Sequence, residues 1–103
     1  MKVLLVNGSP HQNGCTHTAL AEAAAELNRL GIETQELWVG NKPIRSCIGC
    51  GGCFQEKKCV FDEDRVNECV QALKEADGLI VGAPVHYAAP AGACTAFLDR
   101  VFY

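Results

Sequence analysis

Two short, unbroken runs of apolar residues constrain the fold of this chain more than any other feature. Residues 2–6 read Lys-Val-Leu-Leu-Val, which is apolar throughout after the lysine, and residues 79–83 read Leu-Ile-Val-Gly-Ala. A strand with one face in water alternates apolar and polar residues, so unbroken runs of this length indicate strands buried on both faces. Such strands are typical of a parallel sheet, in which helices cross over between neighbouring strands.

The rest of the chain supplies a second strand and three helices. Apolar residues recur with helical spacing after Thr16, after the acidic residues 62–64 and from Ala93 onwards. A more polar strand is expected at residues 32–39. The strand–helix unit thus occurs three times, which predicts a doubly wound α/β fold with a parallel sheet and helices on both faces. Loops 8–16, 40–61 and 84–92 all leave strand carboxyl ends, so we expect them to converge where such folds bind ligands.

Composition excludes several classes of function. The 103 residues carry a net charge of −3, so they offer no basic surface of the kind that nucleic acid requires. No apolar run approaches the roughly 20 residues of a membrane span. The run that begins at Met1 is too short for a signal segment, and Asn7-Gly8-Ser9-Pro10 breaks it. We therefore expect a single domain over 1–103 in a cytoplasmic protein that contacts neither nucleic acid nor membrane.

The first loop has the composition of a phosphate site. It joins a buried strand to the start of a helix, where backbone N–H groups lack partners and favour an anion. Ser9, Thr16 and Thr18 add hydroxyl groups, and no lysine is present. Hydroxyl groups in place of a lysine suit a monophosphate held without Mg²⁺. A plain turn in which Thr16 caps the helix is the alternative.

Four cysteines in thirteen positions form the most specific motif. Cys47, Cys50, Cys53 and Cys59 lie in the irregular segment 40–61. Overlapping two-residue spacings suit a [4Fe–4S] cluster, in which each thiolate binds a different iron, and with a single run Cys59 would complete the set. Zinc, which usually takes two separated Cys-x2-Cys pairs, and free or oxidised thiols remain alternatives.

The other three cysteines carry weaker signals. Cys69 falls on the apolar stripe of a predicted helix, and Cys94 lies in the last predicted helix, so both are interpreted as packing residues. Cys15 precedes a helix start, where thiolates are favoured; a role in the first loop and a reactive thiol are both open.

A third loop begins directly after the buried run at 79–83. Pro84-Val85-His86-Tyr87 places an imidazole and a phenol ring at the edge of the sheet where ligands bind. Such rings could flank a planar cofactor or could simply cover the end of the sheet.

Together these motifs resemble the flavodoxin-like NADPH-dependent FMN reductase family, particularly its iron–sulfur flavoprotein branch. The resemblance rests on Asn7 to Thr16, the cysteine run, residues 76–87 and Phe97-Leu98-Asp99-Arg100, and it covers the whole chain. It implies FMN as cofactor, a [4Fe–4S] cluster on the four cysteines, and NAD(P)H as a possible electron donor. The residues implied to contact the FMN phosphate are Ser9, His11, Cys15 and Thr16, and those implied to line the flavin ring are Pro84, Val85, His86 and Tyr87.

Length is the main departure from that family. Its members have five strands, whereas three are predicted here, which the resemblance arranges in the order 2-1-3. We expect either the N-terminal part of a longer family domain or a shortened chain that completes its sheet in a homo-oligomer, because the third strand would otherwise be an exposed apolar edge.

The implied function is that of an FMN-dependent oxidoreductase. It would pass electrons from a reduced nicotinamide or another donor, through FMN and the cluster, to a small-molecule or protein acceptor. The cofactors do the redox chemistry, so no catalytic acid or base is predicted. A flavin and iron–sulfur electron carrier without enzymatic activity, and a truncated chain that binds neither cofactor, are the alternatives.

Overall fold

Three parallel strands form the centre of the structure, a computed structural model that describes residues 1–102. They are β1 (Lys2–Asn7), β2 (Glu33–Trp38) and β3 (Gly78–Gly82). The order is β2-β1-β3, so the predicted order 2-1-3 is confirmed. Val3 in the central strand lies opposite Thr34 of β2 and Gly78 of β3. Both apolar runs are therefore parallel strands, as their composition predicted.

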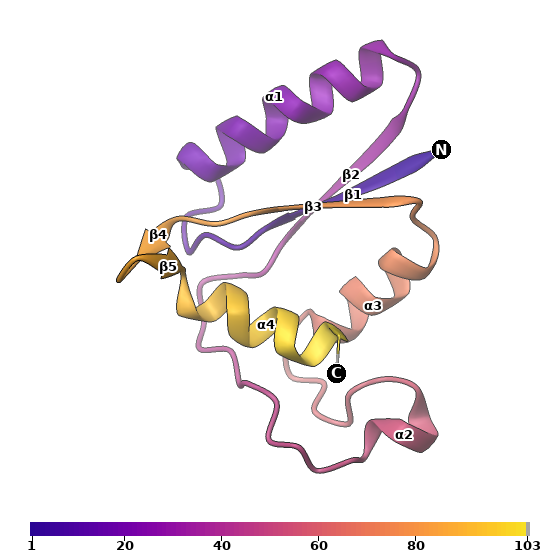
Figure 1. The fold of residues 1–103 in the computed structure, drawn as a ribbon, viewed down its shortest axis with the longest axis vertical. Coiled ribbons are helices and arrows are strands. Elements are labelled where there is room, and N and C mark those ends of the chain that lie inside the picture. The colour runs from indigo at the N-terminus through magenta and orange to yellow at the C-terminus, as the bar shows by residue number, and fades with distance from the viewer. Residues whose placement is uncertain (103) are drawn as a thin grey trace.

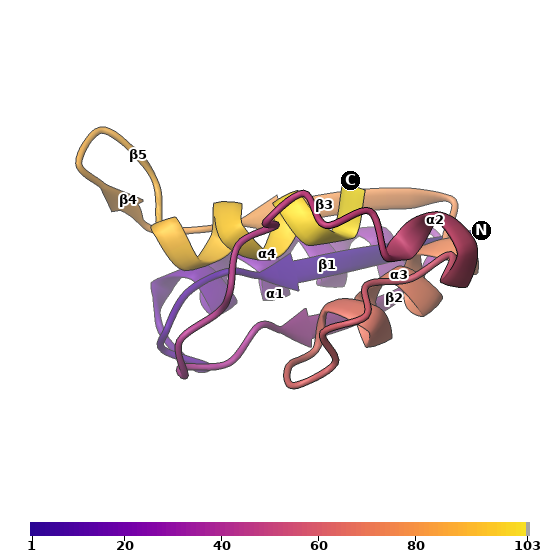
Figure 2. The same cartoon turned by 90° about the horizontal axis from the view of Figure 1, so that it is seen from below.

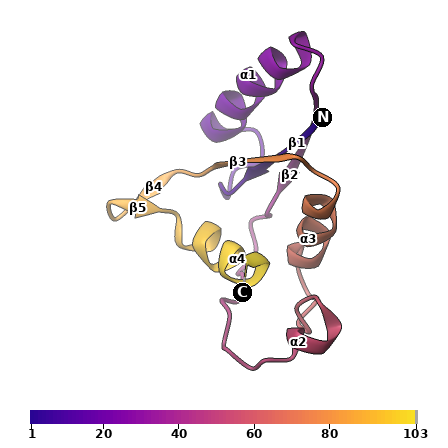
Figure 3. The ribbon, with the colours of Figure 1, turned by 45° about the vertical axis from the view of Figure 1, so that its right-hand side comes forward.

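Helices cover both faces of this sheet, as predicted (Figures 1 and 3). Helix α1 (Cys15–Arg29) lies on one face, and α3 (Val66–Lys74) and α4 (Gly92–Phe102) lie together on the other. Gly31, with φ of +81°, ends α1 in a Schellman motif: its N–H donates to Asn28 O (3.0 Å), and Ile32 N–H donates to Leu27 O (2.9 Å). A residue without a β-carbon adopts this left-handed conformation without strain, so Gly31 ends the helix.

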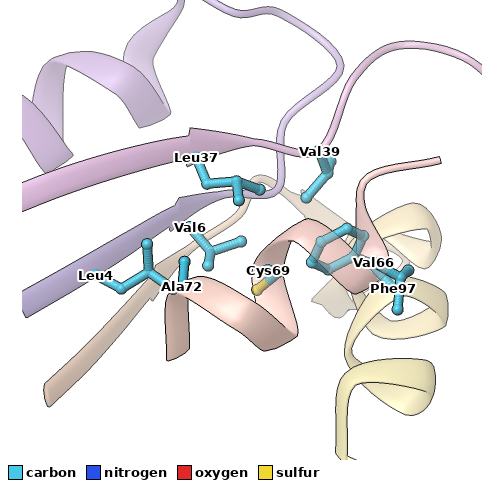
Figure 4. Close-up of a cluster of buried hydrophobic side chains, with 8 residues drawn as sticks. All are labelled: Leu4, Val6, Leu37, Val39, Val66, Cys69, Ala72 and Phe97. Atoms are coloured by element: carbon cyan, nitrogen blue, oxygen red, sulfur yellow. The ribbon is translucent and has the colours of Figure 1, made fainter. Parts of the chain in front are cut away.

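The main core lies between the sheet and the pair α3–α4 (Figure 4). Phe97 of α4 is fully buried there, and the β1 side chains on this face are equally inaccessible. The members of the cluster are Leu4, Val6, Leu37, Val39, Val66, Cys69, Ala72 and Phe97. On the opposite face, α1 buries only Leu20 completely, so its apolar stripe is less covered than its spacing predicted.

Three local features differ from the sequence-based expectations. The 84–92 loop contains a hairpin of β4 (Val85–His86) and β5 (Ala89–Pro90), and the 40–61 segment contains a short helix α2 (Cys53–Glu56). Strand β3 is less buried than its apolar run alone indicates, with Ile80 36% and Val81 38% exposed, because in residues 1–102 it is the exposed apolar edge foreseen for the third strand. None of these features has a period that a sequence would reveal.

The three loops do not all converge. The 8–16 loop and the hairpin lie at the carboxyl edge of the sheet, whereas the 40–61 segment starts at that edge and runs along α4 to α2 at the opposite end (Figures 1 and 2). The structure therefore presents two separate candidate sites. Within residues 1–102, no helix is long and apolar enough to cross a membrane.

Candidate functional site

A buried asparagine organises the first loop. Asn7, at the end of β1, is fully buried. Its Oδ1 accepts a hydrogen bond from Ser9 N–H (3.1 Å), and its Nδ2 donates to Gln12 O (3.1 Å). Because a buried amide is costly to leave without partners, these two bonds hold the loop in one conformation. The side chain carries no charge or nucleophile, and sequence reasoning did not single it out.

Ser9 adds further contacts to the same turn. It is itself buried, and its hydroxyl oxygen accepts a hydrogen bond from His11 N–H (3.1 Å). Its carbonyl oxygen accepts one from the indole N–H of Trp38 (2.7 Å), which ties the loop to the end of β2. The hydroxyl proton of Ser9 is still available to an acceptor, and the His11 ring is exposed beside it. Ser9 and His11, two of the four residues predicted to contact a phosphate, thus lie in a turn that is already ordered.

Gly8 brings the first loop into direct contact with the third. Its N–H donates to Gly82 O at the end of β3 (2.8 Å). A β-carbon at this position would lie 2.6 Å from Cys94 Sγ and 2.8 Å from Cys94 Cβ, both far inside van der Waals contact. Only glycine lets the loop approach α4 so closely. The juxtaposition of these two loops, expected from the parallel sheet, is therefore real.

The first turn of α1 is open to an anion. Cys15 is exposed and Thr16 is half-buried at this helix start. Within the described residues, no side chain caps the start of α1, because the N-cap residue is Gly14, and the first turn contains no acidic residue. Its N–H groups therefore point outward at the positive end of the helix dipole. Such a terminus suits a phosphate group, in agreement with the interpretation of the loop.

The residues predicted to line a flavin ring belong to the β4–β5 hairpin. Pro84 precedes the hairpin, and its carbonyl oxygen accepts a hydrogen bond from Ala91 N–H (3.0 Å), which closes the base. Val85, His86 and Tyr87 are exposed, and Tyr87 at the tip has a positive φ of 49°. The hairpin lies at the same edge of the sheet as the first loop, and the rings of His86 and Tyr87 are open to solvent (Figure 1).

All four cysteines of the 47–59 run line a single cavity beneath α4. The other residues around it include Phe61 and Arg100. None of the described residues lining this cavity is a carboxylate. Two N–H groups point at the sulfurs: Gly49 N–H donates to Cys47 Sγ (3.4 Å), and Arg100 Nε–H donates to Cys59 Sγ (3.4 Å). Hydrogen bonds of this kind stabilise thiolates that carry the negative charge of a metal centre.

The same thiols do not converge on one point. Within residues 1–102, no three His, Cys, Asp or Glu side chains lie close enough together to hold a single metal ion. A cubane places each thiolate on a different iron, so its ligands surround a space instead of meeting at one atom. The four thiols are the donor set that a cluster uses, and a cluster on them stays a prediction.

Burial changes the pKa of two cysteines outside the run, Cys69 and Cys94. Burial raises the pKa of the Cys69 thiol to about 11, and it also raises the pKa of Cys94. Both thiols therefore stay protonated, in agreement with the packing role predicted for them. Burial acts to lower the pKa of Arg100, but hydrogen bonds to Asp64 and Cys59 outweigh it and raise that pKa above its ordinary value. A charged guanidinium thus borders the cysteine cavity, and sequence reasoning gave Arg100 no role there.

Comparison with known proteins gives one consistent result. A family model described as NADPH-dependent FMN reductase matches residues 1–103. An iron–sulfur flavoprotein of Methanocaldococcus jannaschii is 37% identical over 100 residues, which cover 97% of this chain and 51% of the relative. Similar proteins with the same description occur in Archaeoglobus fulgidus (32% identical; 98% of this chain, 46% of the relative) and Methanosarcina thermophila (30% identical; 97% and 52%). The chain spans about half the length of these curated relatives.

Proposed function

The chain belongs to the NADPH-dependent FMN reductase family, and on that premise we propose that it is part of an FMN-dependent oxidoreductase with an iron–sulfur centre. Electrons from a reduced nicotinamide or another donor would pass through FMN to an acceptor, with the cluster as a further carrier. The observation that carries the proposal is the cavity lined by Cys47, Cys50, Cys53 and Cys59 in a chain of this family. The relatives described as iron–sulfur flavoproteins support the same assignment.

In this proposal the first loop and the hairpin hold FMN. The open N–H groups at the start of α1, with the hydroxyls of Ser9 and Thr16 and the exposed His11 ring, bind the phosphate, and Cys15 contacts it from the first helical turn. Pro84, Val85, His86 and Tyr87 border the flavin ring. When bound, FMN would supply two-electron exchange with a donor and one-electron exchange with a carrier. The protein positions the cofactor and needs no acid or base of its own.

The four thiols hold the cluster in the same proposal. No described residue that lines their cavity is a carboxylate, and the charge of the Arg100 guanidinium at its border is balanced by Asp64 behind it. Cys59 is held most firmly, because its backbone N–H donates to Asn67 Oδ1 (3.0 Å) and its carbonyl accepts from Asn67 Nδ2 (2.8 Å). The other three cysteines lie in and before α2.

Two lesser proposals concern the surroundings of the protein. We place it in the cytoplasm, because all seven cysteines, which lie within the described residues, are unpaired and such thiols persist in a reducing compartment.

We also propose that copies of the chain associate through the open edge of β3, where Ile80 and Val81 are partly exposed. Light scattering on the purified chain tests the second point, and a monomer at all concentrations would refute it.

An anaerobic visible spectrum with iron and acid-labile sulfide assays tests the main proposal. After reconstitution we expect flavin bands over a broad shoulder at about 400 nm, with about four irons per chain. Cys53→Ser should lose the iron, whereas Cys15→Ser, which alters a cysteine outside the run, should keep it. A chain that stays colourless with FMN, iron and sulfide would refute the proposal.

An electron carrier with the same cofactors is the second candidate, since no nicotinamide fingerprint occurs in the sequence. NAD(P)H oxidation separates the two: turnover above that of free FMN supports the enzyme, and its absence in a protein that holds both cofactors supports the carrier.

A further inference from the structure

Arg100 is a buried cation that the proposed function does not yet use. It lies in the last turn of α4, and its side chain is 1% exposed. Removing a charge from water is expensive, so a buried guanidinium needs partners for its donors and its charge. The positions of those partners show what this side chain does.

Every nitrogen of the guanidinium has a partner in or next to the cysteine segment. Nη1–H donates to Arg45 O (3.2 Å) and to Asp64 Oδ2 (2.5 Å), and Nη2–H donates to Phe61 O (2.5 Å). Nε–H donates to Cys59 Sγ (3.4 Å). Arg45 comes before the first cysteine of the run and Phe61 after the last. One side chain thus holds both ends of the loop against α4.

The contact with Cys59 differs from the others in its chemistry. The Asp64 carboxylate, whose side chain is 11% exposed, balances the positive charge of Arg100. The Cys59 sulfur accepts a hydrogen bond from Nε–H of the same guanidinium. A cationic donor next to a ligand sulfur stabilises added negative charge, and reduction of a cluster adds one electron. Hydrogen bonds to ligand sulfurs are among the main determinants of cluster potential.

We propose that Arg100 is a positioning residue for the iron–sulfur centre: it fixes Cys59 as a ligand, closes the loop around the cluster and raises the reduction potential of the centre. The inference rests on the proposed function, because it requires a cluster on these four cysteines. It adds a residue outside the cysteine motif, supplied by a helix that follows β3.

Two substitutions separate the geometric from the electrostatic role. Lysine keeps the charge, but its single nitrogen has three donors and cannot serve the four spread acceptors of the guanidinium, whereas glutamine loses the charge as well. Arg100→Lys should therefore retain a potential near that of the wild type but release iron to a chelator about 10-fold to 100-fold faster. Arg100→Gln should release iron at least as fast and show a lower midpoint potential.

Arg65→Gln is the matched control. Arg65 also donates to a carbonyl oxygen, that of Trp38 (2.8 Å), and to a carboxylate, that of Glu68, but it does not line the cysteine cavity. Its loss should affect thermal stability without changing the cluster potential. A purely structural role of Arg100 predicts the same pattern for Arg100→Gln, which is why the potential decides.

The experiment uses the purified full chain, reconstituted anaerobically with iron and sulfide, with iron content, thermal unfolding and an EPR-monitored redox titration on each variant. If Arg100→Gln does not fold, the iron release rate of Arg100→Lys decides. A wild-type protein that holds the cluster, with Arg100 variants equal to it in iron release and potential, would overturn this inference alone. A wild-type protein that takes up no iron would overturn the proposed function and this inference with it.

Discussion

Replacing Asn7 by alanine tests how the phosphate loop is built. The side chain makes two hydrogen bonds, one to Ser9 N–H and one to Gln12 O, and Asn7 and Ser9 are both buried. Leaving the buried Ser9 N–H without an acceptor costs about 1–3 kcal/mol, and the lost bond to Gln12 costs about 0.5–1.5 kcal/mol. We therefore expect the free energy of unfolding to fall by about 2–4 kcal/mol.

The same substitution should weaken FMN binding. The alanine variant must order its loop when the phosphate binds, and about 1.4 kcal/mol of that cost is enough to raise Kd tenfold. Quenching of FMN fluorescence measures Kd, and urea unfolding measures stability independently of the flavin. Asn13→Ala is the control, because Asn13 lies in the same loop with an exposed side chain. Wild-type stability and Kd in Asn7→Ala would refute the role assigned to this amide.

Three further predictions follow from the buried residues. The pKa of Cys69 in the folded chain, about 11, lies above the ordinary thiol value, so its contribution to stability is intact below about pH 9 and is lost as the pH rises through 11. The free energy of unfolding should therefore fall by about 1.4 kcal/mol between about pH 8 and 10 on account of this thiol. In urea unfolding, Cys69→Ala should lose that much less stability over the same pH range than the wild type, and an equal loss in both proteins would contradict the prediction. Phe97→Ala should cost about 3–5 kcal/mol because the ring is fully buried, whereas Phe102→Ala, at a side chain 59% exposed, should cost under about 0.5 kcal/mol. Alkylation followed by mass spectrometry should label Cys15 and Cys50 in the native chain, and Cys94 only after unfolding; early labelling of Cys94 would show that α4 opens.

Most of the fold could be predicted because it depends on local periods. The apolar run at residues 2–6 can only be covered on both faces, which makes β1 the central strand of a parallel sheet. Gly31 marks a helix end because its φ of +81° suits a residue without a β-carbon. Both signals are local in the sequence, so they can be recognised without any knowledge of the tertiary contacts.

Other parts depend on tertiary context. Ile80 and Val81 belong to an apolar run like that of β1, yet they are partly exposed, because a sequence shows which side chains prefer burial but not whether a neighbour exists. The hairpin turns through Tyr87 and Ala88, with φ of 49° and 59°, where glycine or asparagine would have been expected. Because neither Tyr87 nor Ala88 is typical of such a turn, the sequence did not indicate the hairpin.

The two candidate sites differ in how far a sequence can predict them, because different parts of the fold hold them. Gly8 N–H bonds to Gly82 O, so the first and third loops meet as a direct result of parallel strands in register. The cysteine segment has no such support. Its spacing indicates four ligands, but its position depends on Arg100, which lies 41 residues beyond Cys59 in the sequence. Arg100 belongs to the Phe97-Leu98-Asp99-Arg100 motif, but that motif does not indicate that the folded chain brings this side chain to the Cys59 sulfur.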